Sequence, residues 1–304
     1  MRWRGRRQSS NIEDMRGSSG LGLPTGSGPR RGVARAGGGG ILFIIVAVVI
    51  GYFLGIDPSQ ILRALDGGGT MQTSGRTSGQ TGMPRVGTNA SDDEKKQFVA
   101  VVLAETEDVW TQIFKANGRR YSEPTLVIFS GQVRSACGFA SAASGPFYCP
   151  GDQKVYIDLA FYDELRRKFS APGDFAQAYV IAHEIGHHVQ NLTGVLPEFN
   201  RRRQTLSERD ANQLSVRIEL QADCYAGVWA HYTNQKGLLE SGDIDEALNA
   251  AHQIGDDAIQ KRTQGYVVPD AFNHGSSEQR ARWFRAGLKN GNVGDCDTLS
   301  ARSL

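Results

Sequence analysis

Residues 180–194 read VIAHEIGHHVQNLTG, and the interpretation of the fold begins from this stretch. Within it, His183 and His187 are four residues apart, so a helix places both on one face about one turn apart. Two imidazoles in this arrangement can bind one Zn²⁺ at roughly 2.0–2.1 Å each. Glu184 is rotated by about 100° from His183, where it can reach a water bound to the ion and act as a general base. The competing interpretation is a surface helix that carries spaced histidines by chance.

The residues around the two histidines favour a buried helix. The flanking residues VIA and the enclosed Ile185 and Gly186 are apolar, and paired histidines in a buried helix need partners. Glycine inside a helix costs up to about 1 kcal/mol relative to alanine, and close packing across the site would explain Gly186. His188 points away from the face that His183 and His187 share, so we do not expect it to bind the metal.

A second predicted helix supplies the carboxylates that such a site needs. Glu219, in the stretch RIELQADCYAG, lies 32 residues after His187. A carboxylate in an otherwise apolar, alanine-rich helix needs a partner, and the role of third zinc ligand would provide one. Asp223 follows four residues later on the same face, where it can accept the outer N–H of a ligand histidine and fix its tautomer. The alternative is a solvated Glu-Asp pair on an exposed face.

His274 is the candidate for stabilising the transition state. Hydrolysis of a peptide bond at a metal also needs a group for the developing oxyanion. His274 lies in FNHGSSEQRARWFRAG, in a loop just before a predicted helix that Ser276 or Ser277 caps. The alternative is that His274 serves only capping or packing.

Helix and strand signals predict one folded domain over residues 91–304. Ser91 is followed by acids and then by apolar residues at helical spacing, whereas TLVIFSG and KVYIDLAFY are typical of strands. Further helices are predicted at 174–194, 207–232, 242–262 and 275–289, with an irregular hairpin-like stretch at 132–150. The predicted fold class is therefore α+β, mainly helical with a small sheet.

The first 90 residues have a different composition. Residues 1–40 hold eight arginines against Glu13 and Asp14, a local charge of +6, although the whole chain carries +2. Because the excess of positive charge is confined to this end, we exclude binding of nucleic acid along the whole chain. Residues 1–36 are predicted to be a disordered basic tail in the cytoplasm, and residues 57–90 a flexible linker rich in Gly, Ser and Thr.

An apolar run, ILFIIVAVVIGYFLGI, occupies residues 41–56. With four preceding glycines it gives 20 uncharged residues, long enough for one transmembrane helix over residues 37–56. The arginines before it place the N-terminus in the cytoplasm and the folded domain on the other side, by the positive-inside rule. The alternatives are a cleaved signal peptide, a buried core helix and a reversed anchor with a cytoplasmic domain.

The four cysteines are Cys137, Cys149, Cys224 and Cys296. All follow the apolar run, on the predicted extracytoplasmic side, where disulfides persist. Cys137 and Cys149 are 12 residues apart with a loop-like sequence between them, so they are the first predicted pair, which leaves Cys224 with Cys296. Metal ligation is the alternative, but the chain has no C-x-x-C spacing.

Several stretches together resemble a known family. HEIGH with ELQAD resembles the active-site arrangement of the Glu-type zincins, or gluzincins, which include thermolysin. A narrower resemblance is to the neutral zinc metallopeptidase family of membrane-anchored bacterial proteins. It rests on ACGFA, GPFYCPGDQKVYIDLAFYDEL, YVIAHEIGHHVQNLTG, RIELQADCYAGVWA and HGSSEQRARWFRAG, and on the basic opening, apolar run and DPSQIL. It covers most of residues 91–300 and implies a zincin-like metallopeptidase domain with one Zn²⁺ per chain.

The resemblance also implies a role for each matched residue. The expected roles are zinc ligand for His183, His187 and Glu219, general base for Glu184, and orientation of a ligand histidine for Asp223. In zincins a strand before the metal helix pairs with the extended substrate. Here that strand would lie within residues 147–160.

The implied function is a membrane-anchored, zinc-dependent endopeptidase that hydrolyses its substrates by metal-activated water. A single pass of the bacterial inner membrane over residues 37–56 would leave the catalytic domain in the periplasm or outside the cell. Its substrates would be extracytoplasmic proteins or peptides. The alternative function is a non-catalytic zinc-binding scaffold or interaction protein on the same fold.

Overall fold

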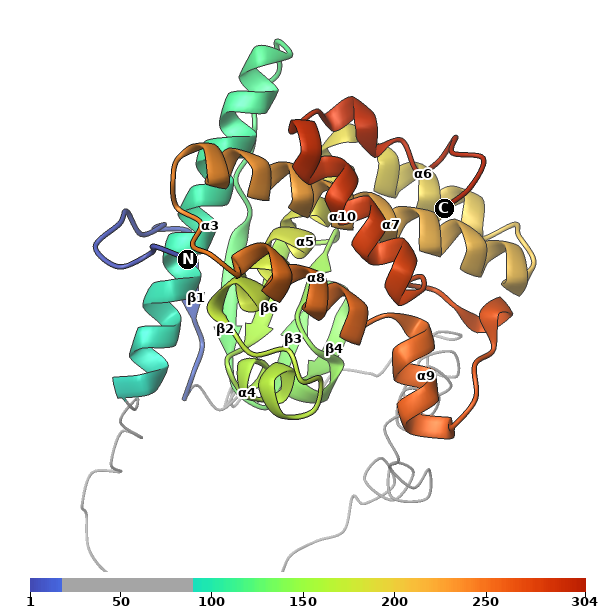
Figure 1. Cartoon of the computed structure of the whole chain (residues 1–304), viewed down its shortest axis with the longest axis horizontal. Coiled ribbons are helices and arrows are strands. Elements are labelled where there is room, and N and C mark those ends of the chain that lie inside the picture. The colour runs from blue at the N-terminus through green and yellow to red at the C-terminus, as the bar shows by residue number, and fades with distance from the viewer. Residues whose placement is uncertain (18–89) are drawn as a thin grey trace, which may run out of the picture.

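The structure is a computed structural model that describes residues 1–17 and 90–304 (Figure 1). These parts are mainly helical with two small sheets, in agreement with the prediction for the folded domain. The α-helices are α3 (Ala90–Ala116), α4 (Ala160–Arg167), α5 (Asp174–Thr193), α6 (Val195–Arg203), α7 (Glu208–Gln235), α8 (Asp243–Gln253), α9 (Asp256–Gln264) and α10 (Ser277–Asn290). Short 3₁₀ helices are η1 (Ala142–Ser144), η2 (Pro269–Ala271) and η3 (Val293–Cys296).

The larger sheet has four strands and supports the site from one side. The strands of both sheets together are β1 (Ile12–Asp14), β2 (Thr125–Phe129), β3 (Gln132–Ser135), β4 (Gly138–Ser141), β5 (Phe147–Cys149) and β6 (Lys154–Asp158). The sheet order is β1-β2-β6-β5, with β1, β2 and β6 parallel and β5 antiparallel to β6. β3 and β4 form a separate hairpin within the predicted irregular stretch. Among the described strands, β5 therefore lies at an edge, and its outer side can pair with another strand.

Glycines allow the long helices α5, α7 and α10 to pack closely. A Cβ at Gly186 in α5 would lie 3.0 Å from the backbone oxygen of Ala222 in α7. A Cβ at Gly287 in α10 would clash with the backbone oxygen of Cys224 in α7. The close packing that the sequence predicted at Gly186 is confirmed, and it holds the two candidate ligand helices side by side.

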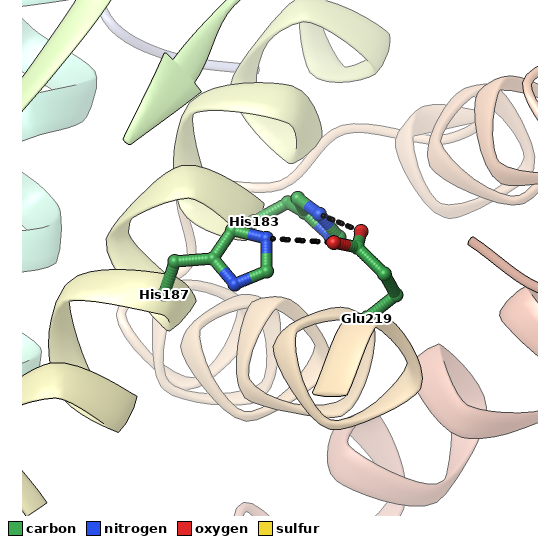
Figure 2. A group of neighbouring side chains, drawn as sticks. All are labelled: His183, His187 and Glu219. Carbon is green, nitrogen blue, oxygen red and sulfur yellow. Dashed lines mark hydrogen bonds and ion pairs between the residues drawn. The ribbon is translucent and has the colours of Figure 1, made fainter. Parts of the chain in front are cut away.

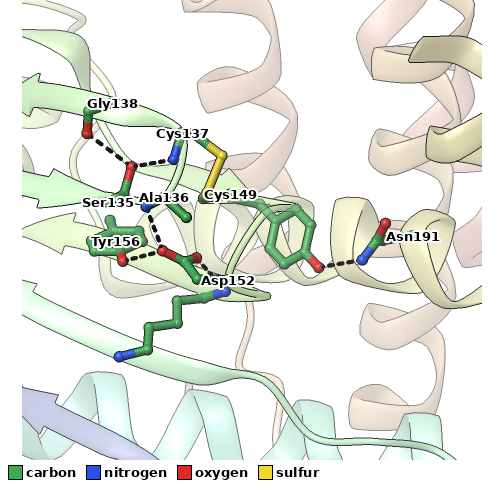
Figure 3. The surroundings of a disulfide bond; sticks show 10 residues. Ser135, Ala136, Cys137, Gly138, Cys149, Asp152, Tyr156 and Asn191 are labelled. Carbon is green, nitrogen blue, oxygen red and sulfur yellow. Dashed lines mark hydrogen bonds between the residues drawn. A yellow bond between two sulfur atoms is a disulfide. The ribbon is translucent and has the colours of Figure 1, made fainter. Parts of the chain in front are cut away.

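Both predicted disulfides are present in the structure. Cys137–Cys149 ties the turn of the β3–β4 hairpin to β5 (Figure 3). Cys224–Cys296 ties α7 to η3. The bonds close sequence separations of 12 and 72 residues, and each stabilises the fold by restricting the unfolded chain. The first bond also anchors one end of the edge strand next to the site.

The helices differ from the predictions in two places. Helix α6 was not predicted. The predicted helix 242–262 is two helices, α8 and α9, which separate at Ile254 and Gly255. A Cβ at Gly255 would clash with the backbone of Ser277, so this break leaves room for the first turn of α10.

Residues 1–17 fold against the domain, so the prediction of a disordered tail is wrong for this part. β1 adds a parallel strand beside β2. Trp3 is 7% exposed and packs edge-to-face on Phe98 of α3, with the ring centroids 5.5 Å apart. The amino group of Met1 lies 2.6 Å from Oδ1 of Asp174, the first residue of α5. A strand pairing, an aromatic contact and a charge pair thus hold residues 1–17, the N-terminal segment, in place.

The predicted transmembrane helix over residues 37–56 lies outside the described residues. Where the chain is described, at 1–17 and 90–304, none of its helices has both the length and the apolar character needed to span a membrane.

The predicted single-pass topology is wrong, because it would place the N-terminal segment and the domain on opposite sides of a membrane. In the structure they are in direct contact. Nε of Arg6 lies 2.8 Å from Oε1 of Glu105, and Nη1 of Arg7 lies 3.2 Å from Oε2 of Glu107, both acids of α3. Arg6 and Arg7, two of the arginines that indicated a cytoplasmic tail, neutralise buried acids instead. The localisation and the transmembrane part of the fold class, both of which assumed that topology, are corrected with it.

Candidate metal centre

The three predicted zinc ligands come together where α5 and α7 lie side by side (Figure 2). His183 and His187 project from α5 toward Glu219 on α7, and one ligand atom from each residue lies within 4.8 Å of the others. Nε2 of His183 is 3.2 Å from Oε2 of Glu219, and Nε2 of His187 is 3.5 Å from Oε1. The helical spacing aligns the two histidines, and the close approach at Gly186 brings the carboxylate to them.

The other nitrogen of each histidine has a partner of its own. Nδ1 of His183 lies 2.8 Å from Oδ1 of Asp223, and Nδ1 of His187 lies 2.8 Å from Oε1 of Gln190. Both partner atoms are acceptors, so each Nδ1 carries a hydrogen and a neutral ring has its lone pair on Nε2. Two lone pairs then face the carboxylate of Glu219, an arrangement that needs a cation between them. Two imidazole nitrogens with one carboxylate are a donor set that fits Zn²⁺.

The electrostatics of the three groups also favour positive charge between them. Burial lowers the pKa of His183, but Asp223 and Glu219 outweigh it and raise this pKa to about 10. The pKa of His187 is raised as well, because Glu219 outweighs the effect of burial. Burial raises the pKa of Glu219, but His187 and His183 hold it well below the usual range. The centre is thus built to hold either protons or a metal cation.

Asp223, predicted to orient a ligand histidine, is fully buried beside His183. It also accepts hydrogen bonds from the Tyr179 hydroxyl at 2.5 Å and from Nε and Nη2 of Arg280 at 2.9 and 3.0 Å. Burial raises the pKa of Asp223, but Arg280 and His183 lower it below its ordinary value. Asp223 is therefore held as an anion with a fixed orientation, which in turn fixes the ring of His183.

Three residues without a predicted role, Tyr179, Gln190 and Arg280, support the ligands. Tyr179 lies one turn before His183, and Gln190 lies three residues after His187, so helical spacing could have indicated both. Nε2 of Gln190 donates to the backbone oxygen of Ile218 at 2.7 Å, which joins α5 to α7. Arg280 comes from α10, 57 residues from Asp223, and no local pattern in the sequence places it here.

Glu184 lies between the ligands and the edge strand. It is 8% exposed and lines the same cavity as His183, His187 and Glu219. Burial raises the pKa of Glu184 and the two histidines lower it, with a net rise. The backbone N–H of Tyr148, in the middle of β5, donates a hydrogen bond to the carboxylate. A carboxyl group with a raised pKa in this position is suited to accept a proton and give it back.

His274 reaches the site from the loop before α10. Its side chain is half exposed, and its Nδ1 lies 3.1 Å from Oδ1 of Asp256. Three successive backbone N–H groups of the loop, including that of His274, donate to Oδ2 of the same aspartate. Ser276 is the N-cap of α10, so His274 does not cap it. Burial lowers the pKa of His274, but Asp256 and Glu219 raise it more, which favours a protonated ring in the cleft.

His188 lies away from the metal centre, as its helical position predicts. It is fully buried, and Nε2 lies 2.7 Å from the backbone oxygen of Ser122. Nδ1 lies 3.0 Å from the hydroxyl of Tyr148. Burial lowers the pKa of His188, so a neutral ring donates to Ser122 and accepts from Tyr148.

Two cavities of about 450 and 340 Å³ meet at the metal centre. They share Tyr148, His187, Glu219 and His274, so they form one cleft that crosses the ligands. A cavity of about 770 Å³ lies between α3, α5 and the end of α10, and the described residues that line it include no acid, histidine or cysteine. Of these cavities, the cleft is therefore the one that holds groups capable of acid–base and metal chemistry.

Comparison with known proteins agrees with this site. Residues 1–299 match the family described as "Putative neutral zinc metallopeptidase". The chain is 47% identical over 299 residues to the uncharacterized protein YpfJ of Escherichia coli, covering 98% of this chain and 99% of that one. It is 39% identical over 263 residues to the uncharacterized protein Rv2575 of Mycobacterium tuberculosis, covering 83% and 85%. No solved structure matches it. By the match over nearly its whole length, the chain belongs to this neutral zinc metallopeptidase family.

Proposed function

We propose that this protein is a zinc-dependent endopeptidase with its active site in the cleft between α5, α7 and β5. The observation that carries the proposal is the orientation of His183 and His187. Both hold their hydrogen on Nδ1 and present Nε2 to the carboxylate of Glu219. Glu184, which would not be needed for metal binding alone, lies in the same cavity. A zinc-binding scaffold would require the three ligands but not this fourth group.

His183, His187 and Glu219 would hold the zinc ion. When bound, zinc polarises a peptide carbonyl and lowers the pKa of a coordinated water to about 7. Glu184 would accept the proton of the attacking water and deliver it to the leaving amine. His274, whose pKa Asp256 raises, would donate a hydrogen bond to the carbonyl oxygen as that oxygen gains negative charge.

The edge strand β5 supports a peptide as the substrate. An extended peptide can pair with the free side of an edge strand through backbone hydrogen bonds, which do not depend on its sequence. In β5 the backbone N–H of Tyr148 already points to Glu184. A peptide on this strand would therefore pass directly over the proposed general base. Because the cleft extends to both sides of the ligands, residues on both sides of the cleaved bond can bind, as an endopeptidase requires.

The variant Glu184→Gln tests this mechanism. It keeps the size of the side chain and the three ligands but removes the base, so the full chain should retain about one zinc per chain and lose hydrolysis by about 10²–10⁴-fold. Zinc content by mass spectrometry and the appearance of new N-termini in a denatured casein substrate are the measurements. Glu164→Gln is the control, since Glu164 lines the same cavity but pairs with Lys168 at 2.9 Å. Undiminished cleavage by Glu184→Gln would rule the mechanism out. Zinc-loaded wild-type protein without any cleavage would favour the scaffold.

A further inference from the structure

The two halves of the cleft differ in the chemistry of their walls. The half toward α4 and α9, here called the apolar half, is lined mainly by Phe147, Phe161, Phe169, Val180, Ile254 and Ile259. The half toward α6 and α7, here called the polar half, includes Phe199, Asn200, Arg203, Asn212 and Ser215. Leu196 and Ile218 also line the polar half. A peptide lying along the cleft therefore meets mainly aromatic and aliphatic side chains on one side of the metal, and a mixture of apolar and polar groups with a cation on the other.

Arg203 differs from the other charged groups of the cleft because it has no charged partner. In the apolar half, Glu164 pairs with Lys168 and Arg280 pairs with Asp223. Within the described parts of the chain, the guanidinium of Arg203 contacts only the ring of Phe199, with its central carbon 5.1 Å from the ring centroid. An unpaired guanidinium in a substrate cleft is available to bind a carboxylate.

The ring beneath Arg203 gives the guanidinium a defined position. Phe199 is only 8% exposed and packs in a small core cluster with Leu196, Leu214 and Ile218. A ring fixed in this way holds a guanidinium by a cation–π contact. Arg203 is exposed to solvent, and this contact places its charge at the wall of the polar half.

The direction of β5 predicts which part of a substrate would meet Arg203. β5 runs from Phe147, which lines the apolar half, to Cys149, next to Pro150, which lines the polar half. Antiparallel pairing is the more stable and more common arrangement for an added strand. A peptide paired in this way runs in the opposite direction. Its residues before the cleaved bond lie in the polar half, and its residues after the bond lie in the apolar half.

We propose that Arg203 makes the protein selective for peptides with an acidic side chain on the N-terminal side of the cleaved bond, while the apolar half takes a large apolar residue after that bond. This inference rests on the proposed function of the cleft and specifies its substrate class. The acidic side chain would pair with the unpaired guanidinium, and the apolar side chain would bury itself among the aromatic residues of the other half.

The test uses fluorogenic peptides that differ at one position. Each carries phenylalanine after the cleavable bond and glutamate, glutamine or lysine two or three residues before it. With the zinc-loaded wild-type chain, kcat/KM should be about fivefold to tenfold higher for glutamate than for glutamine, and high salt should reduce this ratio. Arg203→Gln should bring the ratio close to one, and Arg203→Glu should transfer the preference to lysine.

Arg202→Gln is the matched control. It removes the same charge from the neighbouring position on α6, but Arg202 lines a different cavity, with Leu214 and Leu299. Its ratio should stay at the wild-type value. A glutamate preference that is absent in the wild type, or that Arg202→Gln and Arg203→Gln reduce equally, would overturn the proposal.

A binding measurement separates this proposal from the proposed function. The same peptides, labelled with a fluorophore, are titrated with the zinc-loaded Glu184→Gln variant, and fluorescence anisotropy reports their affinity. Tighter binding of the glutamate peptide that disappears in Glu184→Gln/Arg203→Gln supports the role of Arg203 even if the wild-type chain cleaves nothing. Cleavage without any dependence on Arg203 would leave the endopeptidase in place and remove the selectivity.

Discussion

The metal centre and the N-terminal segment both depend on ion pairs, but the pairs differ in their exposure. At the metal centre, the side chains of Asp223 and Arg280 are 0% and 4% exposed. Along the segment, Arg6 and Arg7 are 36% and 51% exposed, and only their partners on α3 are buried. The first set of pairs excludes water on both sides, whereas the second is open to water on one side.

Ion pairs therefore serve two purposes in this protein. Burying both charges of a pair carries a large desolvation penalty, so the pair adds little net stability. Removing one partner is strongly destabilising, because the other charge stays buried without compensation. Such a pair therefore fixes geometry more than it stabilises. A half-exposed pair is screened and stabilises weakly, so several are needed to attach a segment. The segment therefore also relies on the buried ring of Trp3 and on the β1–β2 pairing. Mutations should produce their largest effects at the metal centre and their smallest at the half-exposed pairs.

The largest effect is expected for Asp223→Asn. The change leaves Arg280 buried without its anion and replaces one of the two carboxylate oxygens, which accept from His183 and Arg280, with an amide group that only donates. We expect a loss of about 3–5 kcal/mol in the free energy of unfolding and a 10–100-fold, order-of-magnitude loss of zinc affinity. Urea unfolding and competition with a chelator measure the two quantities separately. Loss of stability with unchanged zinc affinity would show that Asp223 supports the fold but does not orient the ligand.

A smaller effect is expected for Trp3→Ala in the N-terminal segment. Trp3 is 7% exposed and packs on Phe98, so truncation should cost about 3 kcal/mol of the free energy of unfolding. Zinc content should not change, because the ring packs on α3, which carries none of the three ligands. Arg2→Ala is the control, since Arg2 is 68% exposed and should change stability by about 0.5 kcal/mol or less. Equal stability of Trp3→Ala and wild type would contradict the packing of the segment.

The smallest effect is expected at Glu105, where it should depend on pH. Burial raises the pKa of Glu105, but Lys236 and Arg6 lower it more, so the folded state has the lower pKa. This stabilisation is present above the unfolded pKa of about 4.3 and is lost as the pH falls through the folded value. Glu105→Gln should therefore cost about 1–2 kcal/mol at neutral pH.

The pH series is the informative part of this measurement. Thermal unfolding of wild type and Glu105→Gln is followed from neutral to acidic pH. The difference in stability between the two proteins should shrink once the pH falls below the pKa of a free glutamate. A difference that stays constant down to the lowest pH would mean that packing, and not the charge pairs, is responsible.

Residues that interact within one helix could be predicted from the sequence. The i, i+4 spacing aligned His183 with His187, and the prediction of a cap at Ser276 or Ser277 placed the start of α10 to within one residue. The two disulfides followed from a count of four cysteines and a short loop. The expectation that Glu219 faces the histidines depended on an unexplained carboxylate in an apolar helix, and the structure brings it within reach of both.

Residues that act across large separations could not be predicted in this way. Arg280 reaches Asp223 from another helix, and β1 pairs with a strand more than a hundred residues away. The arginines of the N-terminal segment illustrate the error most clearly. Their number and place before an apolar run satisfied the rule for membrane topology, but nothing in the local sequence reports that Glu105 and Glu107 are buried and need cations.

The candidate donor groups of the metal centre could be found from the sequence, because helical periodicity and side-chain type suffice to select two imidazoles and two carboxylates. How these groups are held and what surrounds them follows from the tertiary structure. Gly186 against Ala222 sets the distance between the ligand helices, and the Arg280–Asp223 pair fixes a ligand ring. The position of residues 1–17 against β2 and α3 also follows from the tertiary structure. Each of these depends on contacts between segments far apart in the chain, and such contacts leave no periodic pattern in the sequence.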